Sequence, residues 1–310
     1  MIAWLARHAR VLLAASLLAG IALPDLASAL KPWLPAGIAG LLWGAMVRLD
    51  WTAVRAHLGR PARLAAGLGW MMLAVPFAAW AVAAALDLSS GLTAGLVLMA
   101  CAPPVMSLPA IALMVGLDAA LALLLVVVGT FLAPLTAPVL LHLLADLDIA
   151  VGAAGMALRL GLLVGGCAGA AVLFRRVLGP RGMARAQPGL ELFNLACLTL
   201  FAIAVMDGVA DALRAEPGRV AVLIAGAYAA ALALMAVTAA VFARLGRPTA
   251  LALGYAAGTR NMALMMAAVP TATTATATGL EDLWLWFGLV QFPIYTLPMV
   301  LARPIRRLLR

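Results

Sequence analysis

An arginine and an asparagine lie in the middle of a long apolar stretch. Residues 251–270 read LALGYAAGTRNMALMMAAVP, which places Arg260 and Asn261 directly after Gly258 and Thr259. A charged side chain inside a bilayer is costly, and such residues mark substrate and ion pathways in membrane proteins. We therefore expect this stretch to form half of a solute-binding site.

A second stretch, residues 101–109 (CAPPVMSLP), holds three prolines in seven residues and cannot remain helical. Broken helices leave free N–H groups at one end and free C=O groups at the other, which lipid cannot satisfy. Two half-helix N-termini that converge near the midplane would create a positive potential suited to carboxylates or other anions. The alternative for the Pro-Pro pair alone is a packing kink. The residues assigned to this site are Pro103, Pro104, Ser107, Leu108, Gly258, Thr259, Arg260 and Asn261.

The elements that must position these residues are transmembrane helices. The chain has 310 residues, 66% of them hydrophobic and 11% charged, with a mean hydropathy of +1.11. These values predict an all-α polytopic membrane protein. The net charge of +9 comes from arginines between apolar stretches, which indicates membrane topology and not nucleic-acid binding. No catalytic motif or nucleotide-binding loop is present, and the three cysteines lack metal-site spacing, so we expect no enzyme activity, cofactor or metal.

Apolar runs of about 20 residues predict ten spans. They are residues 9–27, 33–48, 62–86, 89–115, 118–144, 151–174, 190–212, 220–243, 248–270 and 283–303. They form two sets of five, residues 1–150 and 151–310, and the fourth span of each set is interrupted. Because five is odd, the second set must be inverted relative to the first. Interrupted helices in matching positions of two inverted halves are typical of a transporter's binding site.

Charge predicts the orientation of the spans. Sixteen of the 21 basic residues fall on one side, against Lys31, Arg214 and Arg219 on the other, with Arg159 and Arg260 inside spans. This bias places both termini in the cytoplasm. Residues 7–29 imitate a cleavable signal peptide, but the span count and the charge pattern favour an uncleaved first span. The Thr/Ala tract at 271–278 is interpreted as an external loop or a frayed helix end.

These features together resemble the bile acid:sodium symporter superfamily over nearly the whole chain. The residues that carry the resemblance are 101–107 (CAPPVMS), Gly116-Leu-Asp118, Leu132-Ala-Pro134 and the Gly258-x-x-Asn261 motif. The resemblance implies a panel domain from spans 1, 2, 6 and 7 and a core domain from spans 3–5 and 8–10. It also implies that spans 4 and 9 cross in the core and that an organic anion binds between the domains.

Most sodium ligands implied by the resemblance are replaced. A family asparagine falls on Leu108, a glutamate on Ala256 and a glutamine on Arg260, while a span-3 glutamine falls on Met71 and a span-5 hydroxyl near Val126. Ser107 and Asn261 alone match. Sodium needs several oxygen ligands, and Arg260 would repel a cation beside it. We therefore predict that both sodium sites are absent and that the guanidinium takes the place of the ion.

Three further polar residues lie within spans. Arg159 either reaches the membrane interface or faces the crevice between domains, and Asn194 and Asp207 lie on the panel side. Asp207 is expected to pair with an arginine or to line a water-filled cavity.

The sequence predicts a monomeric secondary or facilitative transporter of a small organic anion in the inner membrane of a bacterium. It would work by alternating access and without sodium, with proton symport, exchange and passive facilitation all open. The competing interpretations are a sodium-coupled organic anion symporter, a metalloid efflux carrier that uses Cys101, and a non-transporting receptor of the same fold.

Overall fold

The chain is predominantly helical in the part that its computed structural model describes, which is residues 15–49, 51–52, 54, 61–145, 152–269 and 280–309. Five helices in these ranges are long and apolar enough to cross a membrane, and a bent pair, Ala15–Ala22 with Pro24–Arg48, makes a sixth candidate. The chain is therefore a polytopic membrane protein. The basic start of the first predicted span and the Thr/Ala tract at 271–278 lie outside the described residues.

The chain divides into two compact units. Unit 1 comprises Met1–Leu49 and Gly161–Val220, and unit 2 comprises Asp50–Leu160 and Ala221–Arg310. Each unit therefore combines residues from both halves of the sequence.

Unit 1 is built mainly from two long helical segments. Helix α3 (Leu34–Arg48) follows α2 (Pro24–Leu30) and the 3-10 turn η1 (Lys31–Trp33), and α10 (Gly152–Ala204), which starts in unit 2, is followed by α11 (Val209–Ala215). In α10 the backbone leaves helical geometry at Gly179, where φ is 61°. The connection predicted between residues 174 and 190 is therefore helical on both sides of one glycine, because glycine adopts positive φ without strain.

Close approach of α3 to α10 depends on glycine. A Cβ at Gly37 would lie 2.8 Å from the side chain of Leu200, and one at Gly40 would lie 2.6 Å from Cys197 Sγ. Trp43 packs edge-on against Phe174 and Phe193 of α10. Small residues thus allow the two helices to approach closely, as in other membrane helix pairs.

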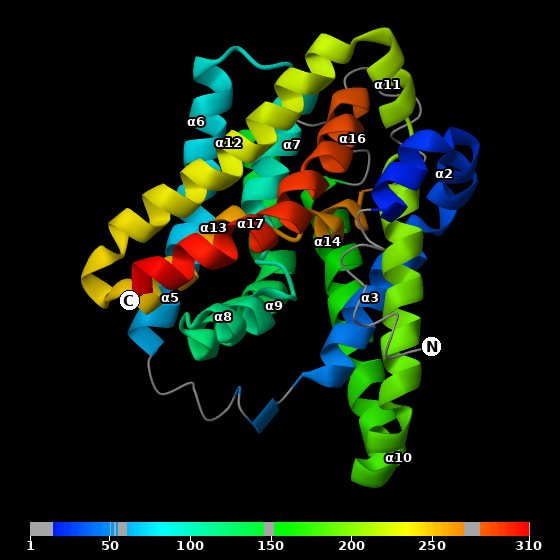
Figure 1. Cartoon of the computed structure of the whole chain (residues 1–310), viewed down its shortest axis with the longest axis vertical. Coiled ribbons are helices and arrows are strands. Elements are labelled where there is room, and N and C mark those ends of the chain that lie inside the picture. The colour runs from blue at the N-terminus through cyan, green and yellow to red at the C-terminus, as the bar shows by residue number, and fades with distance from the viewer. Residues whose placement is uncertain are drawn as a thin grey trace. The chain divides into compact units, whose positions relative to one another are not determined.

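Unit 2 contains both interrupted helices. Its first part has α5 (Pro61–Gly69), a π-helical turn η2 (Trp70–Ala74), α6 (Val75–Ala85), α7 (Ser90–Cys101), α8 (Leu108–Val115) and α9 (Ala119–Leu144). Its second part has α12 (Pro217–Val241), which starts in unit 1, followed by η3 (Ala243–Leu245), α13 (Arg247–Gly258), α14 (Met262–Met266), α16 (Leu280–Leu289) and α17 (Gln291–Leu309). Helices α13 and α17 lie side by side in Figure 1, in agreement with their contacts.

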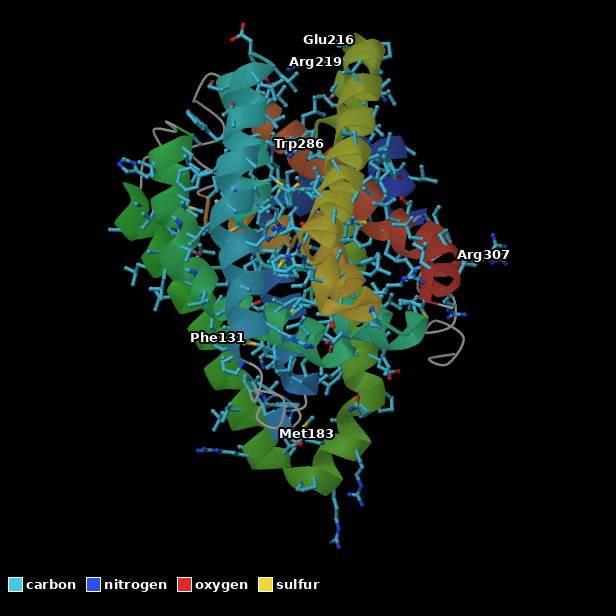
Figure 2. The ribbon with its side chains drawn as sticks, turned by 90° about the vertical axis from the view of Figure 1, so that its left-hand side faces the viewer. Phe131, Met183, Glu216, Arg219, Trp286 and Arg307 are labelled. Atoms are coloured by element: carbon cyan, nitrogen blue, oxygen red, sulfur yellow. The ribbon has the colours of Figure 1, made fainter. Side chains whose placement is uncertain are left out.

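Glycines also set the packing of the broken helices in unit 2. A Cβ at Gly254 of α13 would lie 2.5 Å from the Met235 carbonyl oxygen of α12, and one at Gly258 would meet Met235 and the Ala231 carbonyl oxygen. On α7, a Cβ at Gly95 would lie 2.7 Å from the ring of Trp286, which is labelled on α16 in Figure 2. Helices α7 and α13 are the first halves of the two interrupted helices, and each therefore packs directly against a neighbouring helix.

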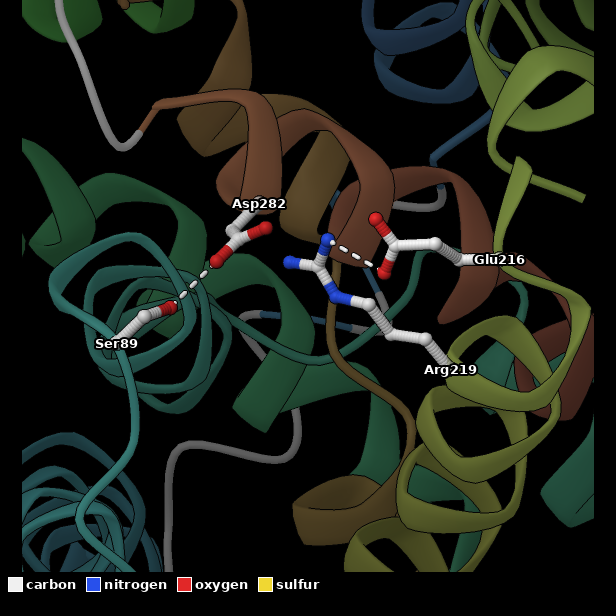
Figure 3. Close-up of polar contacts among 4 residues, drawn as sticks. All are labelled: Ser89, Glu216, Arg219 and Asp282. Carbon is white, nitrogen blue, oxygen red and sulfur yellow. Dashed lines mark hydrogen bonds and ion pairs between the residues drawn. The ribbon is translucent and has the colours of Figure 1, made fainter.

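Both first half-helices are also anchored where they begin. Ser89 caps α7 by accepting the Leu92 N–H, and its hydroxyl donates to the Asp282 carboxylate of α16 at 2.5 Å (Figure 3). Asp118 caps α9 by accepting the Leu121 N–H, and it accepts a second hydrogen bond from the Thr249 hydroxyl of α13. Figure 3 also draws the Glu216–Arg219 ion pair (3.4 Å), a contact between residues one turn apart near the start of α12.

Candidate functional site: the crossing of two broken helices

The two breaks, residues 102–107 and 259–261, meet through their backbones. The Val105 N–H donates to the Thr259 carbonyl at 3.0 Å, and the Asn261 N–H donates to the Pro103 carbonyl at 2.7 Å. These two bonds form an antiparallel bridge between Pro104 and Arg260. The helices that the sequence predicts to be interrupted therefore cross, and each break satisfies backbone groups of the other.

Local sequence explains why the chain is extended at this point. Pro103 and Pro104 have no N–H to continue α7, and the preceding Ala102 adopts φ −67° and ψ 147°. On the other arm, Thr259 adopts φ −118° and ψ 94° at the end of α13. Extended backbone presents its polar groups sideways, and inside a membrane those groups must find partners within the protein.

The Arg260 side chain fills the crossing. It is 1% exposed and donates three hydrogen bonds to backbone carbonyls. Nε donates to Ala257 at 2.9 Å, Nη1 to Ala102 at 2.9 Å and Nη2 to Met71 at 3.2 Å. One guanidinium thus joins the end of α13, the end of α7 and the π-helical turn η2.

The Met71 carbonyl is available because of Pro76. In η2 the Val75 N–H bonds to the Trp70 carbonyl, five residues back, and this register places Pro76 opposite Met71. Proline has no N–H to donate, so the helix leaves the Met71 carbonyl without a partner.

The other two carbonyls are freed by the breaks themselves. The Ala257 carbonyl would pair with the Asn261 N–H in a continuous helix, but that N–H bonds to Pro103 instead. The Ala102 carbonyl follows the last turn of α7, where the helix has already ended. Arg260 therefore satisfies acceptors that would otherwise be buried and unpaired, each at a cost of roughly 1–3 kcal/mol.

Electrostatics favour a cation at this position. Helices α7 and α13 both point their C-terminal ends at the crossing, and a helix C-terminus carries roughly half a negative charge. Among the described residues no carboxylate lies within ion-pair distance of Arg260. Its charge is therefore balanced by backbone dipoles and not by an acidic side chain.

The positions expected to have lost sodium ligands are all buried in unit 2. The side chains of Met71, Leu108, Val126 and Ala256 are at most 1% exposed. None of them carries an oxygen. The backbone carbonyl of Met71 accepts a hydrogen bond from Arg260.

The remaining predicted site residues differ in exposure. Ser107 is exposed at the start of α8, and Asn261 is half-buried and caps α14 by accepting the Leu264 N–H at 3.4 Å. Thr259 is 1% exposed and its hydroxyl donates to the Tyr255 carbonyl at 2.7 Å. Ser107 and Asn261 are thus the predicted polar side chains that retain access from outside the crossing.

The contact of α9 with the first break, at Gly129 and its neighbour Thr130, was not expected from the sequence. Gly129 of α9 would place a Cβ 3.4 Å from Pro103 and 3.5 Å from Pro104, so α9 contacts the first break directly. The neighbouring Thr130 hydroxyl is fully buried and donates to the Val126 carbonyl at 2.7 Å. The sequence signal for this contact is a glycine within a span rich in leucine and valine.

The three secondary residues lie elsewhere. In unit 1, Asp207 accepts a hydrogen bond from Lys31 Nζ at 2.7 Å, so its partner is the single lysine of the chain and not an arginine. Asn194 lies in α10, and its side-chain Oδ1 is 3.3 Å from the point where a Cβ added to Gly44 of α3 would be. Arg159 is exposed on α10.

Comparison with known proteins identifies the family. The family model described as Sodium Bile acid symporter family matches residues 35–216, more than half of the chain. The chain belongs to this family. The family consists of transporters, and the matched range includes the first break but ends before Arg260, so the assignment does not depend on the second arm of the crossing. No curated protein matches the chain.

Proposed function

We propose that this member of the sodium bile acid symporter family carries a small organic anion across the membrane without sodium. The proposed architecture has ten spans in two inverted sets of five, with unit 1 as the panel and unit 2 as the core. Alternating access would then come from movement of one unit against the other. We further propose a monomer in the bacterial inner membrane with both termini in the cytoplasm.

The observation that carries the proposal is the chemistry of the buried crossing. Sodium is a hard cation that needs several oxygen ligands, and the side chains at Met71, Leu108, Val126 and Ala256 supply none. A sodium ion about 4 Å from the guanidinium would be repelled by roughly 4 kcal/mol at an effective dielectric near 20. The Arg260 guanidinium already donates hydrogen bonds to backbone carbonyls on three elements.

The class of substrate follows from the polar groups that stay accessible. Helix α8 begins at exposed Ser107, and its first N–H groups carry the positive end of the helix dipole. Half-buried Asn261 adds an amide on the other arm. A small carboxylate or comparable anion matches these donors.

Flux into proteoliposomes tests the proposal. Purified protein is reconstituted, and uptake of a labelled bile salt and of short mono- and dicarboxylates is measured in sodium or potassium buffers of equal ionic strength. We expect saturable uptake of at least one anion at the same rate in both buffers. Uptake that rises steeply with sodium would instead support a sodium-coupled organic anion symporter.

A matched variant sharpens the sodium test. The double substitution Ala256→Glu with Arg260→Gln brings back a carboxylate and an amide at two positions where the family resemblance expects them. If ligand loss is the reason for sodium independence, the thermal stability of this variant rises with sodium more than that of the wild-type protein. An equal response in both proteins contradicts that reason.

Metalloid efflux and a receptor role are distinguished from anion transport by separate measurements. Metalloid efflux needs a reachable thiol, and Cys101 is 1% exposed, whereas Cys167 and Cys197 are half-buried. We expect a thiol reagent to label Cys101 more slowly than either of them in the folded protein. A non-transporting receptor would bind an anion in a thermal-shift assay and show no flux.

A further inference from the structure

We infer that Arg260 is a permanent internal cation of the crossing and not a ligand of the transported anion. The inference rests on the proposed function for the location of transport, and it adds a statement about coupling. Arg260 is then a positioning residue: it holds α7, α13 and η2 together, and the anion is bound by other groups.

The first argument is geometric. Arginines that bind carboxylate or phosphate groups commonly present two parallel N–H groups to the ligand. Here both terminal nitrogens and Nε point at carbonyls on three different elements, and the side chain is 1% exposed. Turning the guanidinium toward a substrate would leave the Met71, Ala102 and Ala257 carbonyls buried without partners.

The second argument is the charge balance. Two helix C-termini supply roughly one negative charge in total, and the guanidinium supplies one positive charge. The guanidinium therefore offsets the dipoles of these two C-terminal ends, and it is separate from the N-terminal end of α8, which is proposed to meet the anion. Little positive potential from Arg260 is left over to attract an anion.

This arrangement has a consequence for coupling. A bound ion can leave the crossing during the transport cycle, whereas a guanidinium attached to the chain cannot. Arginine also keeps its proton in proteins, so the group cannot cycle between charged and neutral forms. Neither a sodium gradient nor a proton gradient can then be coupled through Arg260.

Chemical rescue tests the internal cation. In the Arg260→Ala variant the three carbonyls lose their donor, and a small guanidinium ion should bind in the space vacated. The thermal unfolding temperature of the purified variant is measured with methylguanidinium chloride at millimolar concentrations, and with sodium or potassium chloride at equal ionic strength. We expect a lower unfolding temperature than in the wild-type protein, restored by several degrees with methylguanidinium and not with sodium or potassium.

The wild-type protein and Arg159→Ala, which removes an exposed arginine, are the controls and should show no response to methylguanidinium. Wild-type stability of Arg260→Ala without any added cation, or a folded but unstable variant that methylguanidinium does not restore, would overturn the inference. Because the measurement needs no substrate, its failure is separate from a failure of the transport proposal.

A second variant keeps the inference testable if Arg260→Ala does not fold. Arg260→Lys retains the charge, but one ammonium group cannot reproduce a planar fork across three elements. We expect this variant to have a lower unfolding temperature and a lower maximal flux, with the KM for the anion within about twofold of wild type. A KM raised tenfold or more, with unchanged unfolding temperature, would make Arg260 an anion ligand and overturn the inference.

Discussion

The Thr249 hydroxyl donates to the Asp118 carboxylate at 3.1 Å, where α13 and α9 both begin. A second hydrogen bond from a hydroxyl to a carboxylate joins Ser89 of α7 to Asp282 of α16. In the proposed inverted repeat, α7 and α13 are equivalent first half-helices, and α9 and α16 belong to equivalent fifth spans. Each hydroxyl–carboxylate contact thus links one repeat to the other, which supports the proposed symmetry.

If unit 2 moves as one body during transport, these contacts stay closed through the cycle. We predict that cross-linking Ser89→Cys to Asp282→Cys with a short thiol reagent, in a background without Cys101, Cys167 and Cys197, leaves anion flux unchanged. The equivalent pair Asp118→Cys and Thr249→Cys should behave in the same way. Flux that stops on cross-linking and returns after cleavage of the linker would mean that the half-helices separate from their neighbours.

Asp118 has two structural tasks and its loss should be measurable. Asp118→Ala removes the cap on the Leu121 N–H and the acceptor for Thr249, so we expect a loss of about 1–2 kcal/mol in the free energy of unfolding. Chemical denaturation in detergent provides the measurement. Asp211→Ala, which breaks an exposed ion pair one turn apart, is the control and should change stability by only a few tenths of a kcal/mol.

The contact of α13 with α12 has no space for a methyl group at Gly254. Gly254→Ala should lower stability by about 1–3 kcal/mol, because the new Cβ would collide with the Met235 carbonyl oxygen. Gly226→Ala on α12 is the matched control, since no atom lies within 4 Å of its Cβ position. We expect this control to gain about 0.5–1 kcal/mol from higher helix propensity, and equal losses in both variants would contradict the packing argument.

The Lys31–Asp207 pair in unit 1 is predicted to be structural. Its side chains are 35% and 21% exposed, so a double-mutant cycle with Lys31→Gln and Asp207→Asn should give a coupling energy of about 1 kcal/mol or less. Flux should persist in Asp207→Asn. Complete loss of flux in a stable Asp207→Asn protein would assign this carboxylate a role in transport.

The location of the crossing was predictable because proline and glycine act locally. The adjacent Pro103 and Pro104 remove two successive backbone donors and interrupt the first helix, and Gly258 followed by polar residues weakens the second. The partners of Arg260 were not predictable, because they are carbonyls, which every residue has. The one local signal was Pro76, five residues after Met71, which identifies a carbonyl without a helical partner only once the π-helical turn is known.

The helical connection at Gly179 was missed for a related reason. Residues 175–189 were left between two predicted spans without an assigned secondary structure, yet arginine is a good helix former. A single positive-φ glycine was sufficient for the change of direction. The charge of residues 175–189 predicts on which side of the membrane they lie. That charge carries no information about their secondary structure.

The hydrogen bonds of the Arg260 side chain also constrain the order in which the helices assemble during synthesis of the chain. Its partners Ala102 and Met71 precede it by 158 and 189 residues, so both carbonyls enter the membrane long before their donor exists. Until the ninth predicted span is inserted, the first half of the chain cannot complete its own hydrogen bonding, and lipid offers no substitute. A nascent chain truncated before residue 260 should therefore remain a substrate for membrane quality-control proteases.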